Sequence, residues 1–284
     1  MPNVAIVTDS VADLPSQVAE EFGITVVPLV VRFGTDTYRD GLDLNSDQFY
    51  EKLKTGKVFP ITSVPSPAAF ADTYDKLAEK TNEIAVISLS SKLSATYQVA
   101  LQSIGLTKKQ CRIEVVDSQW VVMAQGFIAI AAAKASQAGA SLDEVLDVVR
   151  QTIRRVDVRI AFDTLEYLQR GGRIGKAQAF LGSLLKINPI LGIKDGEVHP
   201  YAKKRSRSKA MDYLYNFTAS FDNVEGLAVE YATDLGEANS LIKRLRSKYP
   251  RTPIYLSHAS PVIGTHTGPG LILVSVFGNK RDST

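Results

Sequence analysis

Two hydroxyl side chains stand just before an expected helix, in a pattern that suits the binding of an anion. Thr62 and Ser63 precede Ser66-Pro67, where serine is a typical helix cap and proline a typical first helical residue. A helix N-terminus carries free N–H groups and partial positive charge, which favour a carboxylate or a phosphate. Capping explains Ser66 completely but leaves Thr62 and Ser63 free, so both are candidate ligand-binding residues.

A second group of hydroxyls follows the predicted strand Ile84–Leu89. Ser94, Ala95 and Thr96 lie in the segment Ser90–Tyr97, where the next helix is expected to begin. In open parallel sheets, ligands bind beyond the carboxyl ends of the strands. This segment therefore lies where a ligand is expected, although a simple helix cap at Ser94 would explain it equally well.

A third candidate segment is Gly264–Gly270, in which three glycines predict a tight loop that approaches another group closely. His266 lies in this segment between Thr265 and Thr267. An imidazole can hydrogen-bond an acid group whether the ring is neutral or charged. His266 and Thr267 are therefore candidate ligand-binding residues, although a lone histidine is more often structural.

Basic residues gather in one part of the second half of the chain. The cluster comprises Lys203, Lys204, Arg205, Arg207 and Lys209, and further upstream Arg170 and Arg173 flank Gly171-Gly172. Arginine binds carboxylates and phosphates with two parallel hydrogen bonds, so a docking patch for an anionic partner is one interpretation. A solvated helix start is the simpler one. Contacts with nucleic acid would use the same residues, but no aromatic residues alternate with them.

Several motifs that would identify an enzyme do not occur in the sequence. It has no Gly-x-Ser-x-Gly nucleophile motif, and the glycines and lysine near Gly171 do not have the spacing of a phosphate-binding loop. The three histidines do not have the spacing of metal ligands, so we expect no metal site. These absences weaken an enzymatic interpretation without excluding it.

The elements that would position these residues indicate an α/β protein. Strands and helices alternate through the first half, which favours a mostly parallel sheet with helices on both faces. The predicted strands of this half are Val4–Thr8, Ile24–Val31, Ile84–Leu89 and Ile113–Val116. The second half is less regular. We predict an N-terminal α/β domain of residues 1–157 and a C-terminal α/β domain of residues 158–284, with a ligand in the crevice between them.

Composition narrows the class of protein. The chain has 284 residues, of which 45% are hydrophobic and 22% charged, and it has one cysteine. A signal peptide and an apolar stretch of membrane-spanning length are both missing, so we expect a cytoplasmic protein without a membrane span. The net charge of +3 is too small to imply a nucleic-acid partner.

Several segments taken together carry a resemblance to a known family. They are Thr8-Asp9-Ser10, Thr62 to Pro67, Ser90 to Tyr97, Val116-Asp117-Ser118, Leu168-x-x-Gly171-Gly172-Arg173-Ile174, Asn188-Pro189-Ile190, Arg205-Ser206-Arg207, and Gly264 to Gly270. Their joint presence, in this order, resembles the DegV family of bacterial lipid-binding proteins along nearly the whole chain. One departure is Ala95, where the family usually has glycine.

The resemblance implies a DegV-like fold of two α/β domains with a long-chain, palmitate-like fatty acid between them and no other cofactor. It implies that Thr62 and Ser94 bind the carboxylate, with His266 near it. It also implies a non-catalytic subunit whose partner, a separate ATP-dependent fatty acid kinase, makes acyl phosphate for phospholipid synthesis. Arg170, Arg173, Arg205 and Arg207 would then face the kinase or the head group.

Two other functions remain open from the residues alone. The chain could be an enzyme that acts on a small phosphorylated or hydroxylated substrate, with His266 as acid or base. It could also be a nucleic-acid-binding regulator that uses the basic cluster. The residues that would line an acyl chain cannot be identified from periodicity, because the wall of a pocket and the face of a core have the same pattern.

Overall fold

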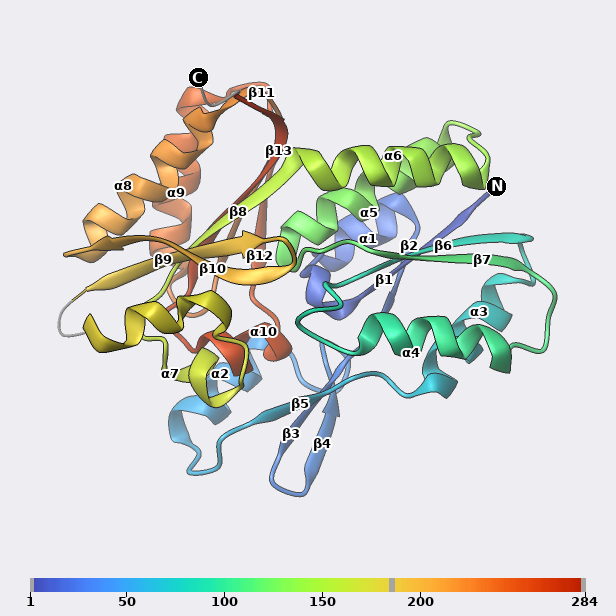
Figure 1. Cartoon of the computed structure of the whole chain (residues 1–284), viewed down its shortest axis with the longest axis horizontal. Helices are drawn as coiled ribbons and strands as arrows, with labels where there is room; N and C mark the ends of the chain where they lie inside the picture. Colours follow the sequence, from blue (N-terminus) through green and yellow to red (C-terminus); the bar gives the residue numbers. More distant parts are fainter. Residues whose placement is uncertain (1–2, 184–186, 282–284) are drawn as a thin grey trace.

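A computed structural model describes residues 3–183 and 187–281 of the chain, which form three sheets surrounded by helices (Figure 1). The strands are β1 (Ala5–Asp9), β2 (Ile24–Val27), β3 (Val30–Phe33), β4 (Asp36–Arg39), β5 (Ile61–Ser63), β6 (Glu83–Ser88), β7 (Arg112–Asp117), β8 (Val156–Ala161), β9 (Asn188–Lys194), β10 (Glu197–Lys204), β11 (Phe221–Tyr231), β12 (Ile254–His258) and β13 (Ile272–Lys280). The α-helices are α1 (Ser16–Phe22), α2 (Ser46–Thr55), α3 (Pro67–Leu77), α4 (Thr96–Ser103), α5 (Val122–Gln137), α6 (Leu142–Arg155), α7 (Glu166–Arg170), α8 (Arg207–Phe217), α9 (Leu235–Lys248) and α10 (Pro261–Thr267). The 3-10 helices are η1 (Ser10–Ala12), η2 (Ile104–Leu106), η3 (Gly175–Ser183) and η4 (Thr218–Ser220).

The first sheet confirms the predicted parallel architecture. Its strand order is β2-β1-β6-β7, and every neighbouring pair is parallel. Helices α3 and α4 cover one face, and α1, α5 and α6 cover the other (Figure 1). The carboxyl ends of β1, β6 and β7 therefore meet at one edge of this sheet, which is where the hydroxyl-rich segment after β6 lies.

The second sheet has the order β10-β9-β8-β13-β11-β12. All its neighbours are antiparallel except β11 and β12. Helices α8 and α9 cover one face of this sheet, and α5 contacts β8, β11 and β13 from the other side. The last strand, β13, lies in the middle of the sheet between β8 and β11.

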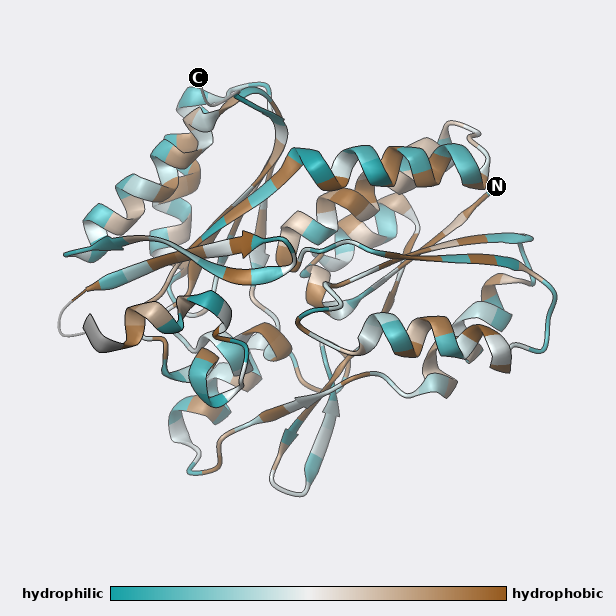
Figure 2. Ribbon diagram, in the orientation of Figure 1, coloured by the Kyte–Doolittle hydropathy of each residue, from teal (hydrophilic) through white to brown (hydrophobic). Residues whose placement is uncertain are grey.

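Helix α5 packs against both sheets and is buried nearly all round. Its sequence explains this position, because apolar residues occur on every side of the helix rather than on one stripe. Figure 2 shows the hydrophobic colouring of α5 where it lies between the sheets. This helix therefore joins the two sheets into one hydrophobic core.

The prediction of a single strand over Ile24–Val31 was wrong. The segment forms β2 in the parallel sheet and then β3, which belongs to a third sheet of order β4-β3-β5. Pro28 separates the two strands. Proline lacks the N–H that a central strand needs, so the chain leaves the first sheet at this residue. Strands β4 and β5 and helix α7 were not expected.

The prediction of a tight loop over Gly264–Gly270 was also wrong for its first half. Residues Pro261–Thr267 form helix α10, with Ser260 as the cap and Pro261 at the first position. The helix ends at Gly268, whose φ of 75° is one that glycine adopts easily. Gly264 is required for another reason, since a Cβ there would lie 2.8 Å from the Tyr50 hydroxyl oxygen in α2.

The first and third sheets come from residues 5–117, and the second sheet comes from residues 156–280. The division into domains 1–157 and 158–284 stays a prediction. None of the helices in the described part of the chain has the length and apolar character needed to cross a membrane.

Candidate functional site

A cavity lies between the carboxyl edge of the parallel sheet, helix α10 and the second sheet. Its empty space is about 720 Å³, including the opening to solvent. The lining residues are Val11, Leu29, Thr62, Leu89, Leu93, Ser94, Val121, Val122, Ile160, Phe162, Leu168, Arg173, Leu191, Ile193, Val198, Val262, Ile263, His266, Thr267 and Leu271.

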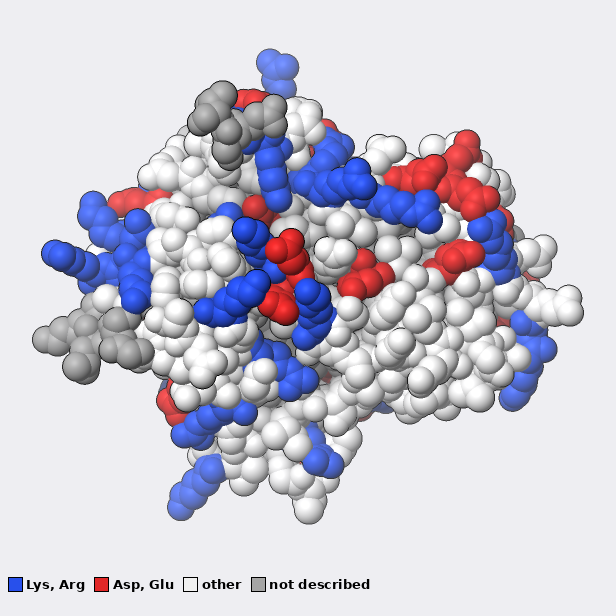
Figure 3. All heavy atoms as spheres, viewed as in Figure 1, with Lys and Arg blue, Asp and Glu red and all other residues white. Residues whose placement is uncertain are grey.

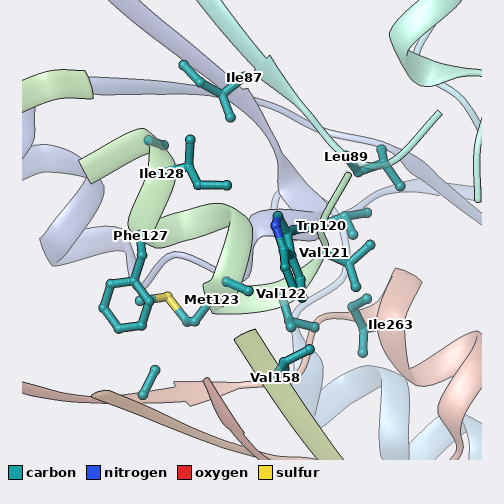
Figure 4. Close-up of a cluster of buried hydrophobic side chains, with 14 of the residues drawn as sticks. Ile87, Leu89, Trp120, Val121, Val122, Met123, Phe127, Ile128, Val158 and Ile263 are labelled. Carbon is teal, nitrogen blue, oxygen red and sulfur yellow. The ribbon is translucent and has the colours of Figure 1, made fainter. Parts of the chain in front are cut away.

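Most of this lining is aliphatic and comes from elements far apart in the chain. Figure 4 shows part of it, where Leu89 after β6, Val121 and Val122 at the start of α5, and Ile263 of α10 lie close together. The polar lining residues are Thr62, Ser94, Arg173, His266 and Thr267. The cavity therefore combines an apolar wall with a few polar groups, most of which the sequence had singled out.

Thr62 and His266 meet across the site although 204 residues separate them in the chain. Thr62 lies in β5 opposite Val31 of β3, and His266 lies in the last turn of α10. Thr62 Oγ1 and His266 Nε2 are 2.9 Å apart, which is a hydrogen bond. Side chains alternate across a strand, so the neighbouring Ser63 is exposed and does not line the cavity.

The environment of His266 keeps its ring neutral. Burial, and secondarily the positive charge of Arg173, lower its pKa from the ordinary 6.5 to about 4. Nδ1 has no hydrogen-bond partner, and a proton on that atom would be a buried donor without an acceptor. The proton of the neutral ring therefore belongs on Nε2, which donates to Thr62 Oγ1. This leaves the hydroxyl proton of Thr62 available to a ligand.

Ser94 is hydrogen-bonded to Thr96 in a similar way. Ser94 Oγ and Thr96 Oγ1 are 2.9 Å apart, and the Thr96 backbone N–H donates to Ser94 Oγ over 3.2 Å. Thr96 is completely buried, so its hydroxyl proton needs an acceptor, and Ser94 Oγ provides one. Ser94 then has its own proton free toward the cavity. Ala95 has a φ of −75°, so this position does not require glycine for a left-handed backbone.

Arg173 is hydrogen-bonded to the segment that carries Ser94. Its Nε donates to the Leu93 carbonyl over 3.1 Å, and Nη1 donates to the Gly171 carbonyl over 2.7 Å. Gly171 in turn packs directly against His266, because a Cβ on this glycine would collide with Nδ1 of the ring. The segment Gly171-Gly172-Arg173 therefore contacts both sides of the polar end of the cavity.

The remaining predicted site residues lie in different surroundings. Thr267 lines the cavity, but its hydroxyl donates to the Ile263 carbonyl within α10 over 2.8 Å. Arg170 is exposed, is paired with Glu166 at 2.6 Å, and stacks over the ring of Phe59. A role for Thr267 or Arg170 in binding stays a prediction.

The basic cluster is a surface feature apart from the cavity lining. Figure 3 shows lysine and arginine side chains gathered where β10 leads into α8. Arg205 is exposed there. Arg207 is held within the chain, since it pairs with Glu237 at 2.7 Å and Asp163 at 3.1 Å. Arg205 is therefore the freer of the two for an anionic partner, and docking by either stays a prediction.

Sequence reasoning did not identify the aliphatic wall or the closeness of Gly171 to His266. The wall residues have no signature, because they resemble core residues. The pair Gly171-Gly172 was visible as a motif, but its contact with a residue nearly a hundred positions later was not. A group of buried acids, Asp13, Asp40 and Glu230, also has no signal in the sequence.

Comparison with known proteins identifies the family of this chain. A family model described as "Uncharacterised protein, DegV family" matches residues 3–279. A DegV domain-containing protein from Halalkalibacterium halodurans is 38% identical over 286 residues, which cover 99% of this chain and 100% of that protein.

Two solved structures share the fold along nearly their whole length. A DegV family protein from Thermus thermophilus, described as binding fatty acid, has a TM-score of 0.89 at 32% identity and covers 97% of this chain and 99% of its own. DegV from Bacillus subtilis, described as a fatty acid binding protein, has a TM-score of 0.89 at 33% identity, with 98% and 100% covered. With its sequence matched from end to end and its fold shared, this chain belongs to the DegV family.

Proposed function

We propose that this protein binds a long-chain fatty acid, with the acyl chain in the aliphatic cavity and the carboxylate at Thr62 and Ser94. The observation that carries the proposal is the cavity itself, in which an extended apolar wall ends at two hydroxyls whose protons are free. The descriptions of the Thermus thermophilus and Bacillus subtilis relatives as fatty acid binding proteins support it.

The tail supplies most of the affinity in this arrangement. Each methylene removed from water contributes about 0.8 kcal/mol, so a chain of about 16 carbons gains roughly 10 kcal/mol before the cost of association. The head group adds hydrogen bonds from neutral hydroxyls to a carboxylate, each contributing about 1.5–3 kcal/mol. The wall therefore sets the strength of binding, and the hydroxyls set the direction in which the ligand enters.

The finer part of the proposal is that this chain presents its ligand to a separate, ATP-dependent fatty acid kinase. Neutral donors quench the charge of a carboxylate less than a paired arginine would, so a bound oxygen remains nucleophilic toward a γ-phosphate. The exposed Arg173 and Arg205 would face the kinase. This chain then carries the acyl phosphate toward phospholipid synthesis and contributes no catalytic group or further cofactor.

The alternative function, an enzyme that uses His266 as acid or base, fits the site less well. An acid–base catalyst works best with a pKa near the operating pH, whereas burial lowers the pKa of His266 to about 4. Its Nε2 is also engaged with Thr62. The aliphatic lining does not match a small, polar substrate.

The experiment begins with native mass spectrometry of the purified protein, followed by solvent extraction and identification of any released lipid. Thr62→Val and Ser94→Ala are then compared with Ser63→Ala, a matched control on the same strand that faces away from the cavity. We expect the first two variants to bind fatty acid at least about tenfold more weakly and to slow kinase-dependent phosphorylation. Equal binding and phosphorylation by all four proteins would refute the proposed head-group site.

A further inference from the structure

Three acidic side chains are buried together behind the wall of the cavity. Asp13 follows η1, Asp40 follows β4, and Glu230 lies in β11. Their exposed fractions are 5%, 3% and 0%, respectively. Acidic residues are almost never buried to this degree without a compensating partner, so each carboxyl group needs one.

Asp13 and Glu230 each have one carboxyl oxygen that accepts a hydrogen bond from the backbone and one that has no donor. Asp13 Oδ2 accepts from the Ser260 N–H over 3.3 Å, and Glu230 Oε1 accepts from the Met123 N–H over 2.8 Å. Asp13 Oδ1 and Glu230 Oε2 are buried and receive no N–H or hydroxyl donor. The two carboxyl groups nevertheless adjoin, because Glu230 pairs with Ser257 across β11 and β12 and the Ser257 hydroxyl donates to the Asp13 carbonyl, so their free oxygens can form a hydrogen bond with each other. Ionised carboxylates are acceptors only, so this bond needs a proton between them.

We propose that Asp13 and Glu230 share one proton in a carboxyl–carboxylate hydrogen bond, which ties the segment after the first strand to the second sheet and makes this junction sensitive to pH.

Apart from the Ser260 side chain, which acts on Asp13, the groups around the pair are further acids and aromatic rings. Asp40 faces the pair as a further acid, and Asp9 in β1 in turn acts on Asp40. Tyr50 of α2 faces the pair with an unpartnered hydroxyl, and His258 stacks on the Tyr50 ring. No lysine or arginine of the described residues forms an ion pair with Asp13, Asp40 or Glu230. No group of metal-binding side chains occurs among residues 3–183 and 187–281 either.

Burial raises the pKa of each of these carboxyl groups. It raises the pKa of Glu230 to about 8 and that of Asp40 to about 7, and it raises the pKa of Asp13 well above its usual range. Asp9 is raised less, to a pKa of about 6, because four hydrogen-bond donors oppose the effect of burial. A proton therefore remains on the pair near neutral pH.

The Asp13–Glu230 pair is also linked to the cavity. The backbone N–H groups that donate to the two carboxyl groups belong to residues next to, or in the same helix as, lining residues. Met123 follows Val122, which lines the cavity at the start of α5. Ser260 caps α10, the helix that contributes Ile263 and His266. Loss of the proton would leave two buried like charges against the elements that form the wall. Raising the pH should therefore lower both the stability of this junction and the affinity for a ligand.

Deprotonation of the pair is expected to destabilise the fold. A carboxyl group whose pKa is higher in the folded than in the unfolded chain stabilises the fold at low pH. That stability is lost progressively as the pH rises from the ordinary value of 4.5 toward about 8, the pKa of Glu230 in the folded protein.

The test follows the carboxyl carbon of Glu230 by ¹³C NMR and the melting temperature of lipid-free protein between about pH 6 and pH 9. We expect Glu230 to titrate well above 4.5 and the melting temperature to fall by roughly 5 °C or more over this range. Glu230→Gln retains a donor toward Asp13 without a titrating proton, so its melting temperature should depend less on pH. Glu51→Gln, an exposed change in α2, should behave as the wild type.

Titration of Glu230 near its ordinary value would overturn the inference, even if the Gln variant fails to fold. An unchanged pH dependence in a folded Glu230→Gln variant would overturn it as well. Because the protein is lipid-free, neither result depends on whether the cavity binds fatty acid.

Discussion

At the scale of single residues, each of the two hydroxyls at the polar end of the cavity is supported by a neutral group behind it. Thr62 is backed by the neutral ring of His266, and Ser94 is backed by the buried hydroxyl of Thr96. In each pair the rear group donates to the front one, which leaves the front proton for a ligand. An anion can therefore bind here without a buried positive charge, whose desolvation would be costly.

This pairing predicts an effect of Thr96, which does not line the cavity. In Thr96→Val, Ser94 loses a donor and its hydroxyl can turn away from the ligand. We expect roughly fivefold weaker binding of a fatty acid, corresponding to about 1 kcal/mol, and no change in binding of its methyl ester. Isothermal calorimetry with both ligands checks this. Equal losses for acid and ester would point to altered packing instead.

At the scale of elements, the sequence predicted the parallel sheet well because its strands are short apolar runs between capped helices. The prediction was wrong at β2 and β3, where one apolar run contributes strands to two sheets and only Pro28 marks the point at which the chain passes from one to the other. It also failed at α10, whose glycines suggested a loop. Gly264 is there to let α10 approach α2, and such a contact between distant elements leaves no local pattern.

The close contact between α10 and α2 gives a prediction at this scale. In Gly264→Ala, the added methyl group would meet the Tyr50 hydroxyl at 2.8 Å and the Phe49 ring at 2.5 Å. Overpacking of this kind costs about 1–3 kcal/mol of unfolding free energy, and it should also move His266 away from Thr62. Urea denaturation measures the first effect and ligand affinity the second. Gly105→Ala, where a Cβ meets nothing within 4 Å, is the control.

At the scale of the whole molecule, the candidate site is built where all three sheets and α10 converge. Thr62, Ser94, His266 and Thr267, which line the cavity, could be named from the sequence because hydroxyls and imidazole stand out beside glycine and proline. The aliphatic wall could not, because Leu191 or Val262 has the same sequence pattern in a core as in a cavity. Only the folded chain distinguishes the two.

A cavity lined from so many elements predicts strong coupling between ligand and stability. A ligand that binds only the folded chain stabilises it by about 2.7 kcal/mol at a concentration of 100 times its dissociation constant. We expect the melting temperature of lipid-free protein to rise by about 5 °C or more when fatty acid is added. Differential scanning calorimetry checks this, with the Thr62→Val variant expected to show a smaller rise. No rise in the wild type would contradict binding in the cavity.

The central place of β13 has a consequence for biosynthesis. This strand is the last one described along the chain, yet it lies between β8 and β11, and α10 comes just before it. Until the ribosome has made α10 and β13, β8 and β11 each lack one neighbouring strand, and the aliphatic wall lacks the residues that α10 contributes. The nascent chain therefore passes through a stage with exposed apolar surface, to which chaperones could bind, and it can hold no lipid in the complete cavity before α10 and β13 have been made.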